Sequence, residues 1–356
     1  MNQAQQAAAN SASTGNTGCV LMHPPPPVTL AHGLQLAADV YGWDARAEWL
    51  SGERDKNMLL HLSDGRKMVL KFINAAETAA ETDIQVRVLD WLQHKACTVH
   101  TPQAIRTAAG ACTTTCRIGN TEVRVRAYTF LEGVSVAQTA ITPELQSSFG
   151  QTAAHMALAL AGFDHPALAQ RVLLWDVMHV GQLVGWAQTI LPDDDIKALA
   201  LRFFPTFNQQ ILPLLRAMPQ QVIHSDLSRS NTVVAASRPQ HIYGVLDFGD
   251  LTRAPRVVEL AIAASYALDE HNGQPLAALA QIVAAYETVL PLSPAEHQVL
   301  PQLVQARLLQ RIVISEWRAA QFPHNSAYIM RSNAQARALI RQLAPDWPGC
   351  NARAGV

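Results

Sequence analysis

The sequence predicts an α+β protein in which a small antiparallel β-sheet lobe precedes a larger, mostly helical lobe. Three observations support this fold class. Alternating apolar and polar runs, separated by short polar turns, fill residues 49–72 and 123–131. From residue 142 onward, apolar residues recur at helical spacing. Two short β-branched runs, at 221–223 and 242–246, interrupt the helical half.

The first half of the chain predicts a β-meander flanked by helices. The segments are a helix at 29–42, strands within 49–62 and at 67–72, a helix at 78–92 and a strand at 123–131. Glu132-Gly133 breaks the last strand and predicts a hinge. The β-branched filler of Cys112-Thr-Thr-Thr-Cys116 favours a strand or hairpin over a zinc site.

The second half reads as helices around one hairpin. Thr142-Pro143-Glu144 is a good helix start, and the stripe from Phe149 to Leu160 continues it. Further helices are predicted near 178–190, 193–217, 257–270, 275–289, 294–320 and 326–343. The predicted organisation is a disordered, proline-ended tail at 1–28, an N-lobe at 29–133, a C-lobe at 134–345 and a tail at 346–356.

Composition narrows the classes of partner. Lysine and arginine number 27 against 28 acidic residues, so the chain lacks the basic field that drives nucleic-acid binding. With 15% charged and 49% apolar residues, an apolar self-association surface and a homodimer fit the composition. Apolar runs fall short of the ~18 residues of a membrane span. With no signal-peptide pattern and five scattered cysteines, we expect a cytoplasmic protein without a membrane partner.

The most informative motif has two parts, one directly after each of the β-branched runs at 221–223 and 242–246. Residues 224–231 read H-S-D-L-S-R-S-N, and residues 247–249 read D-F-G. This order is that of a kinase catalytic loop followed by a metal-binding loop. Asp226 would accept a hydroxyl proton, while Asn231 and Asp247 would supply the hard oxygen ligands that Mg²⁺ prefers. The motif predicts phosphoryl transfer.

The first lobe offers candidates for binding a nucleotide. Lys71 ends a strand, after a glycine-containing hairpin and before a helix, where a kinase lysine pairs with nucleotide phosphates. Its acidic partner would be Glu77, Glu81 or Asp83, and the sequence leaves that choice open. The hairpin candidates for the phosphates are Ser51, Gly52 and Asn57, and those for the base near the hinge are Tyr128, Phe130 and Leu131.

On these motifs the chain resembles the aminoglycoside phosphotransferase and choline kinase superfamily, over roughly residues 29–343. The segment Gly52-Glu-Arg-Asp-Lys-Asn57 and the run that follows Asp250 are most similar to the hydroxylysine kinase branch. The resemblance implies a protein-kinase-like fold, Mg²⁺ as cofactor and ATP or GTP as donor. It also implies Asp226 as base, Asn231 and Asp247 as metal ligands, Lys71 as phosphate lysine and Asp83 as the matching helix carboxylate.

Three departures and three supporting residues complete the prediction. Ser225 stands where the family has glycine, which would be strained if the backbone needs a positive φ. Asp83 and Glu259 stand where glutamate and aspartate, respectively, are more usual. Supporting roles are predicted for His224, Arg229 and Asp250.

The short segment after residues 247–249 points to a small acceptor. Only residues 250–256 precede the next predicted helix, which leaves no activation segment for docking a peptide. We therefore expect a small, amine-bearing hydroxyl acceptor, best represented by a 5-hydroxylysine-like amino acid. Homoserine, choline or ethanolamine, and aminoglycosides are alternatives, and a nucleotide-sensing pseudokinase is the alternative outside enzymes.

Overall fold

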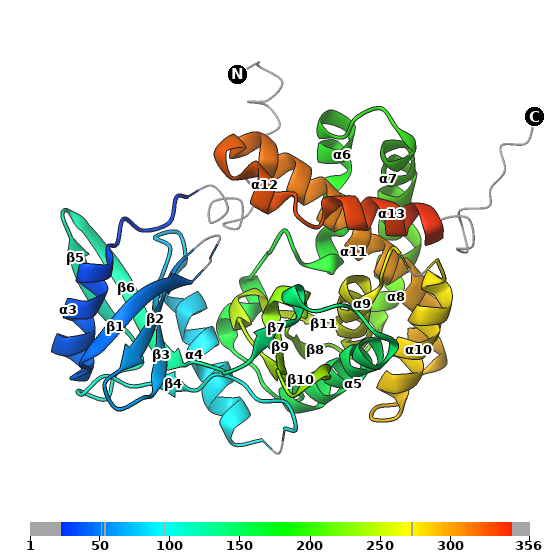
Figure 1. Cartoon of the computed structure of the whole chain (residues 1–356). Coiled ribbons are helices and arrows are strands. Elements are labelled where there is room, and N and C mark those ends of the chain that lie inside the picture. Colours follow the sequence, from blue (N-terminus) through cyan, green and yellow to red (C-terminus); the bar gives the residue numbers. More distant parts are fainter. Residues whose placement is uncertain (1–22, 51, 53–54, 96, 272, 344–356) are drawn as a thin grey trace, which may run out of the picture. The chain divides into compact units, whose positions relative to one another are not determined.

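The computed structural model describes residues 23–343, apart from residues 51, 53, 54, 96 and 272. Contacts divide them into two compact units (Figure 1). The N-lobe holds the described residues up to Glu132 except Cys97–Val99, and the C-lobe holds Cys97–Val99 and the described residues from Gly133 onward. The first carries an antiparallel sheet and the second is mostly helical, which confirms the predicted two-lobed α+β fold class.

The N-lobe sheet has six strands within the described residues, along the path β1-β2-β3-β6-β4 with β5 also on β6. Its strands are β1 (Ala45–Leu50), β2 (Lys56–Leu62), β3 (Lys67–Phe72), β4 (Ala104–Ile105), β5 (Thr114–Ile118) and β6 (Thr121–Thr129). All of their pairs are antiparallel. The predicted meander is confirmed; β4 was missed because two residues show no alternation.

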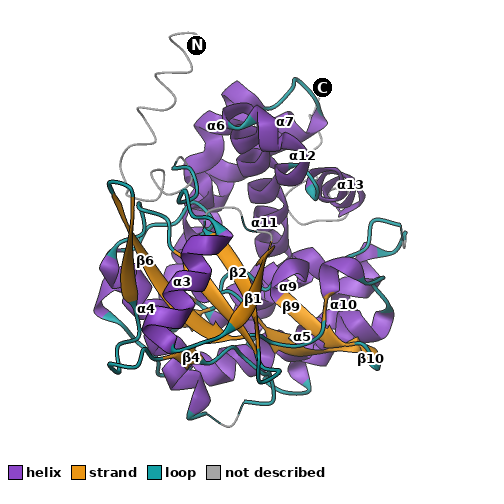
Figure 2. Cartoon of the chain, turned by 60° about the vertical axis from the view of Figure 1, so that its left-hand side comes forward, coloured by secondary structure: helices purple, strands orange, loops and turns teal. Residues whose placement is uncertain are grey.

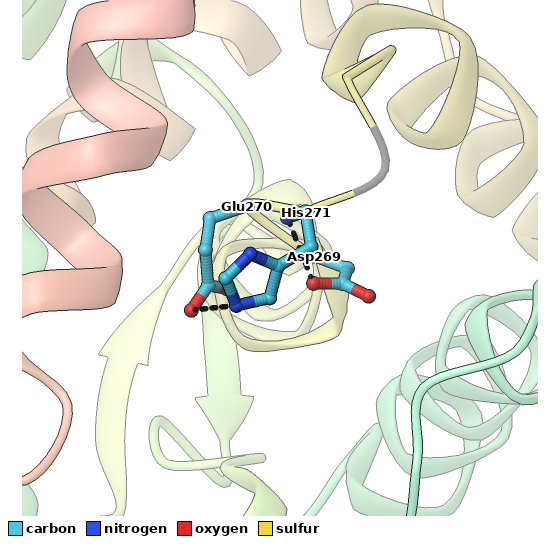
Figure 3. Close-up of side chains that lie close together, drawn as sticks. All are labelled: Asp269, Glu270 and His271. Carbon is cyan, nitrogen blue, oxygen red and sulfur yellow. Dashed lines mark hydrogen bonds and ion pairs between the residues drawn. The ribbon is translucent and has the colours of Figure 1, made fainter.

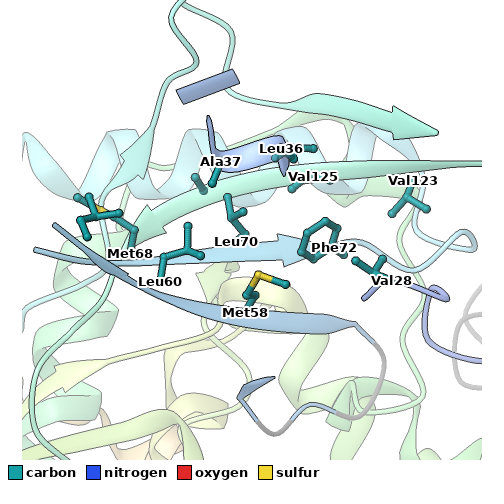
Figure 4. Packing of buried hydrophobic residues seen from close by; sticks show 12 residues of the cluster. Val28, Leu36, Ala37, Met58, Leu60, Met68, Leu70, Phe72, Val123 and Val125 are labelled. Carbon is teal, nitrogen blue, oxygen red and sulfur yellow. The ribbon is translucent and has the colours of Figure 1, made fainter. Parts of the chain in front are cut away.

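One face of this sheet is apolar. Neighbouring residues of a strand point to opposite sides, so alternate positions share a face. Helix α3 (Leu30–Tyr41) covers the apolar face, where Leu36 packs with Phe72 and Val125 in a buried cluster (Figure 4). This cluster is the core of the N-lobe.

The opposite face is polar and faces α4 (Ala79–Gln93). Arg126, which alternates with Val125, bonds Gln85 of α4. Lys71 lies directly opposite Arg126 on the neighbouring strand, so both side chains leave the sheet on this face. The predicted phosphate lysine therefore lies on the α4 side of the sheet.

Both N-lobe helices begin where their capping residues predict. The Thr29 side chain accepts the His32 N–H, and α3 ends at Gly42 with φ 67°. Thr78 and Glu81 form a reciprocal capping box at the start of α4. These local signals explain why the predicted helix boundaries agree with the structure.

Residues 23–28 pack on the N-lobe, so the predicted disordered tail was wrong for this stretch. Pro26 and Val28 are buried, and Val28 joins the cluster beneath α3. The Asn74 side chain donates to the carbonyls of His23 and Pro24 at 3.2 and 3.3 Å. Asn74 is about fifty residues away from His23 and Pro24 in the sequence, so composition alone does not reveal that these residues are bonded to each other. The rest of the predicted N-terminal tail and the whole predicted tail at 346–356 lie outside the described residues.

The C-lobe is built mainly from helices, as Figure 2 shows in purple. They are α5 (Pro143–Leu160), α6 (Val184–Ile190), α7 (Asp195–Thr206), α8 (Leu212–Ala217), α9 (Arg256–Ala267), α10 (Pro275–Glu287), α11 (Pro294–Gln321), α12 (Ser326–Ile329) and α13 (Asn333–Leu343). Helix α5 packs on α9 and α10, and α11 packs on α9 and α13. None of the described helices is both long and apolar enough to cross a membrane.

Some predicted helices are divided. The helix expected at 193–217 becomes α7, a π-helical turn at Phe207–Ile211 and α8. Pro205 and Pro213 lie on either side of the break, and each removes a backbone N–H that a regular helix uses. The stretch 178–190 similarly starts as a 3₁₀ helix before α6.

Short strands in the C-lobe frame the predicted loops. They are β7 (Val134–Ser135), β8 (Gln221–Ile223), β9 (Thr232–Ala235), β10 (Arg238–Val245) and β11 (Thr252–Ala254). The β9–β10 hairpin is confirmed, with β7 on its edge, and β11 pairs with β8. The loops carrying Asp226 and Asp247 leave β8 and β10, respectively.

The buried Val28 yields a test of the N-terminal packing. Val28→Ala should lower the free energy of unfolding of the N-lobe by about 1–2 kcal/mol, because two methyl groups leave a buried site. Urea unfolding measures the change. Val172→Ala, the same change at a side chain 37% exposed, is the control. Equal small effects of both variants would show that residues 23–28 do not belong to the core.

Candidate active site

Two loops of the C-lobe are joined by β-structure. The first follows β8, and the second follows β10, the returning strand of the β9–β10 hairpin. The Leu246 N–H donates to the carbonyl of Asn231 at 2.8 Å, which ties the end of the first loop to the start of the second. The loops are therefore neighbours, as the sequence predicts for those carrying Asp226 and Asp247.

His224 bridges these loops. Its Nδ1 accepts the Asp226 N–H at 3.2 Å, and its Nε2 lies 3.0 Å from the carbonyl of Leu246. A carbonyl only accepts, so Nε2 carries the proton and Nδ1 stays free to accept. Burial lowers the pKa of His224, opposed by the Leu246 carbonyl and by the charges of Asp247 and Asp250. Burial therefore favours the neutral form that this geometry needs.

Asn231 fixes the carboxylate of Asp226. Its Nδ2 donates to Oδ2 of Asp226 at 2.6 Å and to the Asp226 carbonyl at 3.1 Å. Since the amide NH₂ faces Asp226, the amide oxygen is the Asn231 atom left for a cation. The Asp226 side chain is 24% exposed, so an acceptor hydroxyl can reach it. The pair has the geometry that a base and an adjacent metal ligand require.

Asp247 offers the second oxygen ligand. Its backbone is left-handed, with φ 56°, and its Oδ1 accepts the Gly249 N–H at 3.1 Å. Carboxylate and amide oxygens form the donor set that Mg²⁺ prefers. Asn231 and Asp247 therefore fit a hard divalent cation.

One arginine anchors each of the two loops through backbone carbonyls. Arg171 donates to the carbonyls of Gly249 and Leu251 at 2.6 and 2.9 Å, on either side of the buried Asp250. Arg229, within the first loop, donates to the carbonyls of Tyr266 and Leu268 at 2.7 and 2.9 Å. The predicted supporting residues Arg229 and Asp250 thus lie where the loops are anchored.

Ser225 adopts the positive φ that the sequence flagged, 68°. The N–H groups of His224 and Ser225 both donate to one oxygen of Glu259, the second at 3.3 Å. The Ser225 carbonyl lies 3.5 Å from Nη2 of Arg307. The strained peptide is therefore held from both sides by buried charged groups.

Glu259 is fully buried at the start of α9. Burial raises its pKa to about 7, although the two N–H donors from His224 and Ser225 act in the opposite direction. Nearby Asp226 raises it further and Arg307 lowers it. Glu259 therefore titrates near neutral pH.

Arg307 of α11 contacts the carboxylate of Asp226. Its side chain is 1% exposed, and Nη2 lies 3.3 Å from Oδ1 of Asp226. Nη1 donates to the carbonyl of Trp175 at 2.8 Å, and the guanidinium packs near the rings of Trp175 and Tyr266. The sequence analysis missed Arg307. Its signal was a charged residue within the apolar stripe of a long helix.

In the N-lobe, Lys71 pairs with an acid that the sequence analysis did not consider. Its Nζ lies 2.9 Å from Oδ2 of Asp55, in the turn between β1 and β2. Asp83 instead forms an ion pair with Arg87 at 2.8 Å, with 46% of its side chain exposed. The pairing of Lys71 with a helix acid stays a prediction that now competes with Asp55.

The turn before β2 accommodates only a small residue at Gly52. A Cβ there would lie 2.8 Å from the Asn57 amide nitrogen and 2.8 Å from the Asp55 carbonyl. Asn57 lies opposite Lys71 in the β2–β3 register. Ser51 is outside the described residues. Gly52, Asn57 and Lys71 are therefore grouped at one end of the sheet.

Two of the residues predicted to bind the nucleotide base near the hinge, Tyr128 and Phe130, already form hydrogen bonds within the N-lobe. The Tyr128 hydroxyl accepts from Nε of Arg126 at 3.2 Å. The Phe130 N–H donates to the Lys67 carbonyl at 3.1 Å. A nucleotide base would therefore use the carbonyl of Phe130 or the backbone of Leu131.

A separate group of polar side chains follows α9 (Figure 3). Asp269, Glu270 and His271 place one ligand atom each within 4.8 Å of one another. Asp269 accepts the His271 N–H at 3.1 Å, and His271 lies 3.6 Å from Glu270 with 85% of its side chain exposed. These mutual contacts explain the group, and we assign no metal to it.

The two-lobed fold, with Asp226 hydrogen-bonded to Asn231 and the loop of Asp247 beside them, has the arrangement of kinase-like phosphotransferases. The chain belongs to the phosphotransferase enzyme family, which it matches over residues 47–300.

Curated relatives extend the match over most of the chain. Hydroxylysine kinase of Danio rerio is 26% identical over 304 residues, covering 82% of this chain and 84% of the relative. Hydroxylysine kinase of Mus musculus is 26% identical over 328 residues, covering 86% of each. The protein is accordingly a small-molecule kinase that phosphorylates a hydroxyl, within the branch that the sequence predicted.

Solved structures share the fold. A microcompartment-associated aminopropanol kinase superposes with a TM-score of 0.68 at 18% identity, covering 89% of this chain and 96% of that one. An amicoumacin kinase in complex with AMP-PNP, Ca²⁺ and Ami gives a TM-score of 0.64 at 12% identity, covering 86% of this chain and 94% of that one. Kinase-like phosphotransferases use a nucleotide as phosphoryl donor together with a divalent cation.

The strain at Ser225 yields a stability test. Ser225→Gly should raise the free energy of unfolding by about 1 kcal/mol, because glycine adopts φ 68° without a Cβ clash. Ser225→Ala keeps the Cβ and is the control, expected to gain less. Urea unfolding compares the three proteins. A glycine variant no more stable than the alanine variant would contradict strain at this residue.

Glu259 yields a pH test. Its pKa in the folded protein, about 7, lies above the ordinary value of 4.5, so protonation favours the folded state. This contribution is complete below pH 4.5 and is lost as pH rises through about 7. Relative to Glu259→Gln, the wild type should lose up to about 3 kcal/mol of stability across that window. Parallel unfolding curves at pH 5 and 8 measure this. A pH-independent difference would contradict the raised pKa.

Proposed function

We propose that the protein transfers the γ-phosphoryl group of ATP or GTP, with Mg²⁺, to the hydroxyl of a small amine-bearing metabolite. The best candidate is a 5-hydroxylysine-like amino acid. The single observation that carries this proposal is the Asp226–Asn231 pair beside Asp247, locked by neutral His224. The similarity to hydroxylysine kinases supports the acceptor class. A cytoplasmic location and a homodimer remain predictions.

The mechanism assigns one task to each residue. As the acceptor oxygen attacks the γ-phosphorus, its proton passes to Asp226, and the bond from that phosphorus to the β–γ bridging oxygen breaks. Asn231 and Arg307 orient the Asp226 carboxylate from either side. Mg²⁺ held by Asn231 and Asp247 would neutralise charge on the phosphates. Lys71 would bind the same phosphates.

An amino acid acceptor carries an ammonium and a carboxylate besides its hydroxyl, so recognition requires charges of both signs. Choline, ethanolamine and aminoglycosides lack the carboxylate, whereas homoserine has it but lacks the side-chain amine of 5-hydroxylysine. An acceptor panel, assayed with both ATP and GTP for release of ADP or GDP, separates them. Release of ADP or GDP with 5-hydroxylysine and none with choline would support the proposal. Release with choline and none with 5-hydroxylysine would replace the amino acid by choline as the proposed acceptor.

Replacing the base tests the mechanism. Asp226→Asn should lower kcat by about 10²- to 10⁴-fold, because the amide cannot take the hydroxyl proton. Nucleotide affinity should stay within about twofold. Asp193→Asn is the matched control, since the Asp193 side chain is 92% exposed. Undiminished turnover would remove Asp226 from its role. Nucleotide binding by the wild type without transfer to any acceptor would favour the pseudokinase.

A further inference from the structure

A carboxylate of the β1–β2 turn pairs with Lys71. Nζ of Lys71 and Oδ2 of Asp55 are 2.9 Å apart, and the two side chains are 8% and 11% exposed. In protein kinases the corresponding lysine pairs with a glutamate of the helix that follows β3. Here that helix is α4, so Asp55 comes from a different element than the kinase glutamate.

The acids at the start of α4 have contacts of their own. Glu77 accepts from the Thr82 hydroxyl at 2.7 Å. Glu81 closes the capping box of α4. Asp83 forms its ion pair with Arg87 one turn along the helix, on a side that is half-exposed. Asp55, in contrast, is nearly buried against Lys71.

Asp55 is also held independently of Lys71. Its Oδ1 accepts the backbone N–H of Asn74 at 2.8 Å. Asn74 is 1% exposed, and its side chain binds the carbonyls of His23 and Pro24. One carboxylate thus connects the end of β3 and the N-terminal segment to the lysine. A rigid acceptor placed in this way limits where the flexible lysine side chain can lie.

We propose that Asp55 is the positioning residue for Lys71 in the nucleotide site, supported by Asn74 and the segment His23–Pro24. The proposal rests on the proposed function, in which Lys71 binds the nucleotide phosphates. Asp55 restricts the lysine before the nucleotide arrives, so less side-chain freedom is lost on binding. The position of Lys71 then depends on the β1–β2 turn, which also holds Gly52, while Asn57 of β2 lies opposite Lys71.

Nucleotide binding measures this role directly. Asp55→Asn keeps the shape and an oxygen for the Asn74 N–H but removes the charge. It should raise the Kd of a fluorescent ATP or GTP analogue and the KM for the donor by about 10- to 100-fold. The KM for the acceptor should stay unchanged. Asp55→Glu, which keeps the charge, should recover part of the loss. Asp64→Asn, in the exposed β2–β3 turn, is the matched control.

Other outcomes overturn the proposal. An unchanged donor Kd in Asp55→Asn would do so, as would a loss confined to Asp83→Asn. The Lys71→Met background separates positioning from stability: there Asp55→Asn should cause no further loss. An equal loss in both backgrounds would make Asp55 merely structural. If Asp55→Asn does not fold, the same cycle is run with Asp55→Glu. A wild-type protein that binds neither nucleotide would refute the proposed function itself.

Discussion

The candidate active site depends on one neutral imidazole. His224 accepts the Asp226 N–H and donates to the carbonyl of Leu246, whose own N–H is bonded to Asn231. The loops carrying Asp226 and Asp247 are therefore linked through both the N–H and the carbonyl of Leu246. A proton added to Nδ1 would set a donor against the Asp226 N–H and break the link. Burial opposes that protonation, so the environment that excludes water also maintains the geometry.

The buried charged side chains around Ser225 also maintain the geometry of the loop that carries Asp226. A left-handed serine costs about 1–2 kcal/mol, and burying a glutamate and an arginine costs more unless both are well bonded. Glu259 receives the two N–H groups at the bend, while Arg307 contacts the Ser225 carbonyl and the Asp226 carboxylate. The loop therefore has few alternative conformations. These hydrogen bonds offset part of the energetic cost of the bend and of the buried charges. They also hold the Asp226 carboxylate in one direction.

Sequence reasoning succeeded where the signals were local. The longer N-lobe strands, the capped N-lobe helices and the β9–β10 hairpin follow from patterns within short stretches of sequence. The positive φ of Ser225 was indicated by the family resemblance, in which glycine stands at that position. Sequence reasoning failed where the partner is distant. Asp55 reaches Lys71 only through sheet register, and Arg307 lies 81 positions from Asp226. Proximity of such pairs is a product of the fold, so spacing alone does not reveal it. The break between α7 and α8 was missed because apolar periodicity outweighed two prolines.

The segment after Asp247 explains why this site has the form of a small-molecule kinase. Gly249 and Leu251 are fixed through their carbonyls by Arg171, and Thr252–Ala254 pairs at once with β8, the strand that leads to Asp226. Helix α9 then begins at Arg256 and supplies Glu259 to the catalytic loop. Protein kinases place a long, switchable activation segment at this point. Here the chain returns within a few residues to support the loop it has just left. The loops carrying Asp226 and Asp247 therefore support each other over a short stretch of chain.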